Sequence, residues 1–590
     1  MIDALASLFK RDEPSELRRA WPHLALVALV HLAVAWPGAA ERGVIAEEVQ
    51  PYLRRYPAVL DLQMEQGSRE HADEHLAFLP PNDDPAVRAA ADAGGETSSR
   101  WVGTNQWPEV GYQGRTRNYP VFVRGHQTSI GTMWGVAGAP LLGGGIGGVR
   151  RANVLLGLVL LGLTWALARR LGLSRALATF AAIGCALSPG LFWVGRTGYG
   201  YEIASRVLMM AALFAIASTG RLSTKHAVLG GLAFAGAILS RATIATTLVP
   251  PLLLMALHPR RFAGWPRLAT LLGVGGGVPV AFVALALATL PFAAGTEPAA
   301  TLSLDALAGR TLVTPAMAAV QLAWVADARM ILTPLIEGGV TVSMGWVRPL
   351  LGGVVLVIAL ARWWFGRARE GERLFVAGLL GNSLIGAWLY GSPLQFQLGM
   401  ALEPLFVLAV AHQLHDLGER RALHAVLACV ALLGVRAVTL RSVIWSERST
   451  DNPMLSGVAQ RSLVTALRER GVRGDDLVTT TYDHVGVLES LTDERLRPVH
   501  AWRLLKAANV PPDVVEAHWR LILDDAPRCH VLLTRAPSLV AGRFADQDAV
   551  GRALEKVLTE RGVAVTERLP ITGDGGAVVF ELLTLAPCGR

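Results

Sequence analysis

The chain has 590 residues, of which 52% are hydrophobic and 17% are charged, and its mean hydropathy is +0.39. Soluble globular proteins carry about 25% charged residues, so this composition excludes a wholly soluble protein and indicates membrane spans separated by charged loops. The formal net charge is +8, and nearly all cationic residues are arginines beside apolar runs, where orientation in a bilayer explains them. No nucleic-acid-binding motif accompanies them, so we expect membrane lipids and no nucleic acid as partners.

The first apolar run, residues 21–38, follows a charged N-terminal segment, residues 1–20. It has no clear small-residue cleavage signature, so we expect a retained signal-anchor helix. Ten further apolar runs follow, and the sequence predicts a polytopic α-helical membrane protein with about eleven transmembrane helices. The expected spans are 21–38, 152–168, 175–193, 203–219, 225–241, 243–258, 266–292, 349–364, 374–391, 396–414 and 423–443.

Positive charge alternates along these spans. Basic residues precede the first span and follow every even-numbered span, as at Arg169-Arg170 and Arg420-Arg421. The positive-inside rule assigns these clusters and the N-terminus to the cytoplasm. Because the composition also suggests a GC-rich bacterial genome, we expect a multi-pass protein of the bacterial inner membrane. The transmembrane domain (21–443) then has an extracytoplasmic first loop (39–151) and second loop (293–348), and an extracytoplasmic C-terminal domain (444–590).

Two extracytoplasmic parts have structure of their own. Residues 126–147 are apolar, but a span there would break the charge alternation, so we expect an interfacial helix. Residues 444–590 alternate strand-like runs at 476–482, 530–534 and 577–585 with helical runs at 512–523 and 549–562, which predicts a small α/β domain. Cys529 and Cys588 can pair if this domain is outside the cytoplasm, a question that their spacing leaves open.

Three acids stand directly after the first span: Glu41, Glu47 and Glu48. A carboxylate at the outer membrane face can take a proton from an acceptor hydroxyl as a general base, or help to hold a divalent metal near a phosphate. The alternative is a solvated acidic pair in the first turn of a helix, where the dipole favours it. The sequence requires no metal, so the cofactor is unknown.

The acidic pair is followed by Tyr52. An acidic pair and a tyrosine after the first span resemble the Asp-Glu motif of the C-type (GT-C) membrane glycosyltransferases, which include protein O-mannosyltransferases and bacterial aminoarabinose transferases. Residues 118–134 are similar to the segment before that family's second span, and 150–157 with Arg169-Arg170 to the second span itself.

The resemblance continues to the third and fourth spans. Ser188-Pro189, Arg196 and Tyr201-Glu202 stand where the family returns to the outer face, and the likeness covers roughly residues 20–220 in order. One departure is that Glu47 replaces the usual aspartate. The extra methylene moves the carboxylate by about a bond length, to which catalysis is sensitive, and Glu41 is a rival for the same role.

A second set of candidates consists of basic residues expected at the outer face. The resemblance implies a polyprenyl-phosphate-linked sugar as donor, and guanidinium groups suit its phosphate because they donate hydrogen bonds in a fixed fork. Arg241 is the most telling, because it separates two apolar runs. The alternative is snorkelling to lipid headgroups. The arginines concerned are Arg124, Arg196, Arg206, Arg241 and Arg348.

Three weaker candidates remain. His126 opens the interfacial segment, which lines the catalytic cavity in the family that the chain resembles, but a lone histidine also suits a helix cap. The sequence His-Ala-Asp-Glu-His at 71–75 has metal-ligand types, although a solvated helix face is the usual interpretation. Tyr482-Asp-His484 ends an expected strand and also fits a plain turn.

The first hypothesis is a membrane glycosyltransferase that moves a sugar from a polyprenyl phosphate carrier to a glycan, lipid or protein acceptor on the extracytoplasmic face. Glu47 or Glu48 would deprotonate the acceptor, and Arg196 and Arg241 would hold the departing phosphate. A non-catalytic scaffold of the same fold in envelope polysaccharide assembly or export is the alternative. A secondary transporter ranks last, because the spans contain almost no acids apart from Glu403.

Overall fold

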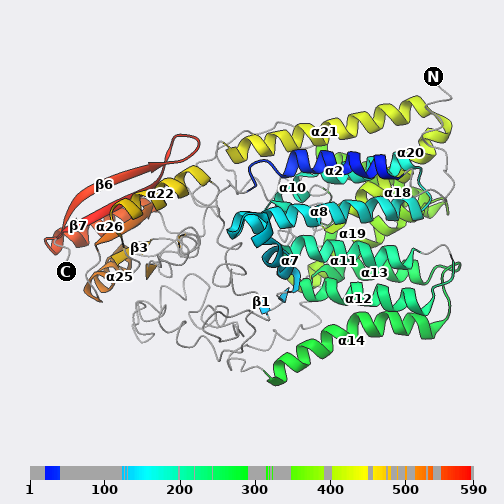
Figure 1. Cartoon of the computed structure of the whole chain (residues 1–590), viewed down its shortest axis with the longest axis horizontal. Coiled ribbons are helices and arrows are strands. Elements are labelled where there is room, and N and C mark those ends of the chain that lie inside the picture. The colour runs from blue at the N-terminus through cyan, green and yellow to red at the C-terminus, as the bar shows by residue number, and fades with distance from the viewer. Residues whose placement is uncertain are drawn as a thin grey trace.

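The computed structural model consists of a bundle of apolar helices and a small α/β domain beyond one end of it (Figure 1). The structure describes residues 20–39, 122–124, 127–128, 130–196, 200–217, 220–241, 243–289, 314–315, 318, 322, 347–390, 401–448, 456–472, 476–479, 488, 499–500, 512–525, 529–535 and 547–586.

The bundle helices follow the expected spans, with ends shifted by a few residues. The largest shifts are seven residues, at the start of α8, which begins at Gly145 rather than 152, and at the start of α20, which begins at Glu403 rather than 396. The helices are α2 (Trp21–Ala35), α8 (Gly145–Arg170), α9 (Arg175–Ala186), α10 (Pro189–Gly195), α11 (Gly200–Ile216), α12 (Thr224–Ser240), α13 (Ile244–Ala256), α14 (Trp265–Thr289), α18 (Val347–Trp364), α19 (Glu370–Tyr390), α20 (Glu403–Arg420) and α21 (Ala422–Arg448).

Some of the bundle helices are long and apolar enough to span a membrane. Among the described residues, Ile146–Arg170 and Ala422–Trp445 are each long and apolar enough to cross a bilayer, and α9 and α10 together form a third such segment, bent by 62°. Trp21–Ala35, Ile244–Ala256 and Gly352–Trp364 are apolar but shorter. The chain therefore has the apolar helices of an integral membrane protein, and the count of eleven spans stays a prediction.

The bundle surface is apolar where α18 and α21 face outward. Val357 and Leu360 of α18 and Leu427, Val430 and Val438 of α21 are exposed. Soluble proteins rarely expose such apolar surface to water, whereas contact with lipid chains, which are equally apolar, carries no free-energy penalty. These two helices accordingly have the surface of lipid-facing helices.

The region before α8 forms a short layer against the bundle. Strand β1 (Phe122–Arg124) pairs with β2 (Gln127–Thr128), and then come α7 (Ile130–Gly138) and the 3₁₀ helix η3 (Ala139–Leu142). Gly143 and Gly144 have φ values of 99° and 72°, which side chains rarely adopt, so glycines are needed for the tight turn into α8. The nine residues of α7 are too few to span a bilayer, which fits an interfacial helix.

The C-terminal domain is a sheet covered by helices on both faces. Its strand order is β4-β3-β5-β7-β6, parallel among β4, β3 and β5 and antiparallel onward. The predicted strands and helices near 476, 512, 530, 549 and 577 are all present, whereas α22 and the two edge strands, β4 and β6, were not predicted. The elements are α22 (Gly457–Glu469), β3 (Leu477–Thr479), β4 (Val499–His500), α25 (Pro512–Asp525), β5 (His530–Thr534), α26 (Gln547–Glu560), β6 (Ala564–Thr572) and β7 (Val578–Ala586).

Two hydrophobic cores result from this three-layer arrangement. On one face, Trp519 of α25 and Leu554 of α26 pack with Val531 of the sheet. On the other, Leu463 of α22 packs with Phe580. Side chains of successive strand residues point to opposite faces, so the two layers of helices both find apolar partners.

Candidate functional site

One end of the bundle gathers the segments that the sequence predicted at the outer face, and we call it the Arg196 end. It comprises the residues after α2, the starts of α8 and α11, and the ends of α10 and α12. Direct contacts join these segments, although the residues concerned lie up to 159 positions apart along the chain, as Pro37 and Arg196 do. Figure 1 shows α7 and β1 at this end, with the C-terminal domain beyond it.

The exit of the first helix is held by basic side chains from later helices. Arg196, which follows α10, donates through Nη2 to the Pro37 carbonyl at 2.9 Å, and Arg150 of α8 donates to the Ala39 carbonyl at 3.3 Å. The guanidinium of Arg151 stacks over the Trp36 ring, 5.9 Å from its centroid. The first loop therefore leaves the bundle from a site lined by guanidinium groups, two residues before Glu41.

A buried acid lies between two further arginines at the same end. Glu202, in the first turn of α11, forms ion pairs with Arg206 at 3.2 Å and with Arg241. All three side chains are at most 5% exposed. A buried arginine costs about 2.5–3.5 kcal/mol on insertion scales, so a carboxylate that pairs with two of them makes both tolerable. Glu202 thus compensates charge rather than standing free.

The backbone places Arg241 at this end. Arg241 lies between α12 and α13, where its extended backbone conformation, φ −159° and ψ 107°, ends α12. Its Nε donates a hydrogen bond to the Thr243 hydroxyl at 2.7 Å. The Thr246 hydroxyl lies within hydrogen-bond distance of two oxygens, the Thr243 carbonyl at 2.8 Å and Asn382 Oδ1 at 2.7 Å. One hydroxyl hydrogen cannot serve two acceptors, so the Asn382 amide is consistent with a flipped orientation in which it donates to Thr246.

A second buried network lies deeper and connects to the first. Glu403 of α20 accepts a hydrogen bond from the Ser188 hydroxyl and lies 3.6 Å from Arg436 of α21, and it also interacts electrostatically with Arg206. Among the described residues, both networks and the exit of α2 together contain five buried arginines and two buried glutamates. The arginines are Arg150, Arg196, Arg206, Arg241 and Arg436, and the glutamates are Glu202 and Glu403.

The opposite end of the bundle holds basic residues that the sequence predicted in the cytoplasm, and we call it the Arg261 end. Arg261 pairs with Glu370 at 2.8 Å, and Arg170 donates to the Phe214 carbonyl at 2.6 Å. Arg362 and Arg369 both pair with Asp416. Arg261 is buried, but Arg362 and Arg369 are partly exposed, so the arginines of this end form a rim that reaches the surface of the bundle.

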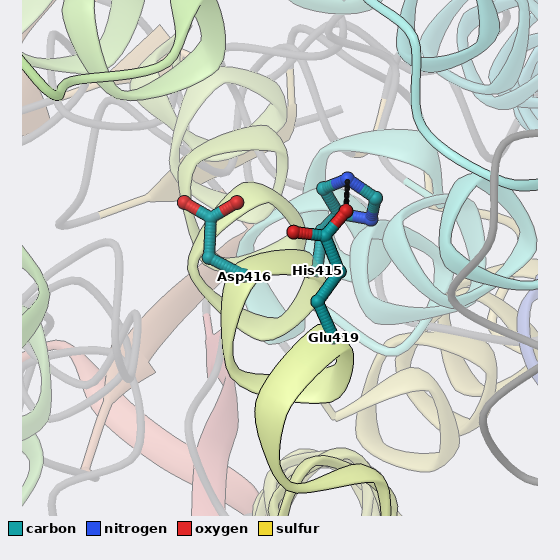
Figure 2. Close-up of side chains that lie close together, drawn as sticks. All are labelled: His415, Asp416 and Glu419. Carbon is teal, nitrogen blue, oxygen red and sulfur yellow. Dashed lines mark ion pairs between the residues drawn. The ribbon is translucent and has the colours of Figure 1, made fainter.

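A group of metal-ligand types occurs at the Arg261 end, formed by His415, Asp416 and Glu419 of α20 (Figure 2). Figure 2 shows the His415 ring beside Glu419, with Nε2 and Oε1 3.3 Å apart, while Asp416 projects from another side of the helix. Asp416 already neutralises two arginines. A cation would compete with both guanidinium groups, so this group is better explained as part of the ionic rim.

Of the residues singled out in the sequence, the structure brings together Arg196, Glu202, Arg206 and Arg241 at one end. Glu41, Glu47, Glu48 and His126 lie outside the described residues, as do the segments 71–75 and 482–484. Arg124, Tyr201 and Arg348 lie on described backbone, but their side chains lie outside it. No described side chain tests the catalytic assignments.

Sequence reasoning missed the roles of Arg150, Glu403 and Arg436. A signal for them exists, because each is a charged residue at the edge of or within an otherwise apolar run, where a buried partner is needed. Only the partners themselves, on helices distant in sequence, had to come from the folded structure.

No family model matches the chain, and no curated protein matches it. Among solved structures, the arabinofuranosyltransferase AftD from Mycobacteria matches at 13% identity and a TM-score of 0.45, over 98% of this chain and 40% of AftD. ArnT from Cupriavidus metallidurans bound to undecaprenyl phosphate matches at 14% identity and a TM-score of 0.41, over 96% of this chain and 98% of ArnT. Likeness at this level does not establish membership in a family.

Proposed function

We propose that the chain is a membrane glycosyltransferase of the GT-C type. It takes a sugar from a polyprenyl phosphate carrier at the extracytoplasmic face and transfers it to a glycan, lipid or protein acceptor. The observation that carries the proposal is the convergence of buried arginines from separate helices at the Arg196 end, where two of them contact the exit of the first helix.

The chemistry of a phosphate leaving group explains why arginines would gather there. As the bond between the anomeric carbon and the phosphate oxygen breaks, negative charge develops on that oxygen. Fixed hydrogen-bond donors in a site of low dielectric stabilise developing charge more strongly than water does. Arg196 and Arg241 are buried and held by Pro37 and Thr243, so they are oriented before the donor arrives.

The proposed reaction is a direct displacement. Glu47 or Glu48, with Glu41 as the rival, accepts the proton of the acceptor hydroxyl. The acceptor oxygen then bonds to the anomeric carbon with inversion, and the polyprenyl phosphate leaves with the electron pair of the broken bond. Tyr201, His126, Arg124 and Arg348 are proposed to contribute to substrate binding. No step requires a metal, although a divalent ion near the phosphate stays an alternative.

The proposed orientation puts the Arg196 end outside the cytoplasm of a bacterial inner membrane. The basic rim at the Arg261 end supports this through the positive-inside rule. Cys529 in the C-terminal domain is disulfide-bonded, and disulfides persist in oxidising compartments such as the periplasm. An extracytoplasmic C-terminal domain is then placed to meet the acceptor.

Binding of undecaprenyl phosphate to the purified protein in nanodiscs tests the donor site, with uncharged undecaprenol as the probe that lacks phosphate. A hydrogen bond to a charged group contributes about 1.5–3 kcal/mol, so we expect Arg196→Gln and Arg241→Gln to weaken binding of the phosphate probe roughly tenfold to hundredfold. Binding of undecaprenol should not change. Arg261→Gln, which alters a buried ion pair at the other end, is the matched control and should bind both probes normally.

Sugar transfer in cells that carry Glu41→Gln, Glu47→Gln or Glu48→Gln tests the enzyme against the scaffold. Labelled envelope glycans should disappear for the variant that lacks the general base, while membrane insertion and undecaprenyl phosphate binding persist. Unchanged glycans in all three variants would favour a non-catalytic scaffold. A wild-type protein that does not distinguish undecaprenyl phosphate from undecaprenol would refute the donor site.

A further inference from the structure

The third apolar run of the sequence is broken in the folded chain. Helix α9 ends at Ala186, α10 begins at Pro189, and the two axes differ by 62°. Ser188 caps α10 by accepting a hydrogen bond from the Leu191 N–H at 3.0 Å, and proline suits the first helical position because its missing N–H has no partner to lose. The break interrupts the regular hydrogen bonding of the helix, so the last carbonyls of α9 and the first N–H groups of α10 need other partners.

Side chains from two other helices support the break from both sides. Glu403 of α20 accepts a hydrogen bond from the Ser188 hydroxyl at the start of α10. Arg436 of α21 donates to the Gly184 carbonyl, in the last turn of α9, at 2.5 Å. The two charged groups lie 3.6 Å apart, and each side chain is 4% exposed. An ion pair therefore links the last turn of α9 to the first residue of α10.

The angle of this break determines where α10 carries Arg196. This helix has seven residues, which at 1.5 Å per residue is about 10 Å, and Arg196 is its C-cap. A change of about 10° at the break would therefore displace Arg196 by about 2 Å, whereas site geometry matters on the order of 1 Å. Arg196 also stacks on Phe192 of the same helix, 4.6 Å from the ring centroid, so it moves with α10.

We infer that Glu403 and Arg436 are positioning residues that set the bend between α9 and α10 and thereby hold Arg196 where the donor phosphate binds. They act through Arg196 and do not touch the donor. The inference rests on the proposed function for its binding consequence, but the placement of α10 is a physical claim that stands apart from any ligand.

The test uses Glu403→Gln in the full-length protein in nanodiscs, with two readouts. Amide hydrogen exchange of peptides covering 187–196 reports the position of α10, and it should quicken about fivefold or more because local opening becomes easier. Affinity for undecaprenyl phosphate should fall about tenfold, which corresponds to about 1.4 kcal/mol. Glu372→Gln, which alters another buried acid paired with arginine at 3.3 Å, is the matched control and should change neither readout.

A double-mutant cycle separates positioning from a general loss of structure. If Glu403 acts through Arg196, then Glu403→Gln should have almost no further effect on affinity in the Arg196→Gln background. Additive losses would overturn the inference, as would unchanged exchange at 187–196. If Glu403→Gln does not fold, Arg436→Gln, which breaks the same ion pair from the α21 side and keeps the Ser188 cap, makes the same comparison.

The two proposals fail in different ways. If the wild type does not bind undecaprenyl phosphate, the proposed function fails, and the exchange readout alone still decides whether Glu403 positions α10. If the wild type binds and Glu403→Gln leaves both readouts unchanged, the positioning role fails and the donor site survives.

Discussion

At the scale of single residues, the molecule depends on charges that are buried and paired. The resemblance made Tyr201 and Glu202 candidate substrate-binding residues, because Tyr201-Glu202 stands where the family returns to the outer face. The fold gives Glu202 two arginine partners on α11 and after α12, which explains how Arg206 and Arg241 can be buried together. A residue that balances charge at the proposed donor site would affect stability as well as affinity.

Replacement of Glu202 by glutamine should destabilise the protein strongly. Breaking a buried ion pair costs about 3–5 kcal/mol, because the remaining charge has no compensation in a medium of low dielectric. Unfolding of the purified variant in mixed micelles with increasing SDS measures the loss. Glu419→Gln, which alters an exposed partner of His415, should change stability by about 1 kcal/mol or less. Equal stability of Glu202→Gln and wild type would contradict the pairing.

At the scale of elements, a strand of the C-terminal domain lowers the pKa of a histidine by burying it. His530 begins β5, between Leu477 of β3 and Thr584 of β7. Burial is the largest influence and lowers the pKa of His530, against the attraction of Asp476. Protonation is therefore less favourable in the folded domain than in the unfolded chain, so stability is complete above the ordinary histidine pKa and falls as the pH drops below it.

Urea unfolding of the C-terminal domain, followed in the full-length protein in detergent, should reveal this dependence. The urea midpoint of the wild type is expected to fall between pH 7.5 and pH 5, on either side of the unperturbed pKa of about 6.5. His530→Gln cannot be protonated in this range, so its midpoint should fall less. A variant that loses as much stability as the wild type over this range would show that another group titrates.

At the scale of the whole molecule, charge is distributed between the two ends of the bundle. At the Arg261 end, Arg362 and Arg369 are partly exposed beside the buried Arg261, whereas the Arg196 end has its arginines buried around the exit of α2. The first pattern is typical of membrane orientation and the second of an anion site. The C-terminal domain lies beyond the Arg196 end (Figure 1), so both would face the same side of the membrane.

Reporter fusions in a bacterial host test this orientation. Alkaline phosphatase, which folds only outside the cytoplasm, should be active when fused after residue 448 and inactive when fused after residue 170. A fluorescent protein that matures only in the cytoplasm should give the reverse pattern. Phosphatase activity at residue 170, or its absence at residue 448, would contradict the proposed orientation and the donor site with it.

The sequence by itself determined the helices of the bundle, because a long apolar run such as 423–443 favours a helix whichever other helices pack against it. It also determined several strands and helices of the C-terminal domain through their local periodicity. Only the tertiary structure decided that Glu202 pairs with Arg241, that Glu403 and Arg436 support the break before α10, and that Arg196 contacts the end of α2. The physical reason is the distance along the chain over which each interaction acts. Hydropathy and capping act between neighbours in the chain, whereas a buried charge selects its partner among all the residues that the fold brings within a few ångströms.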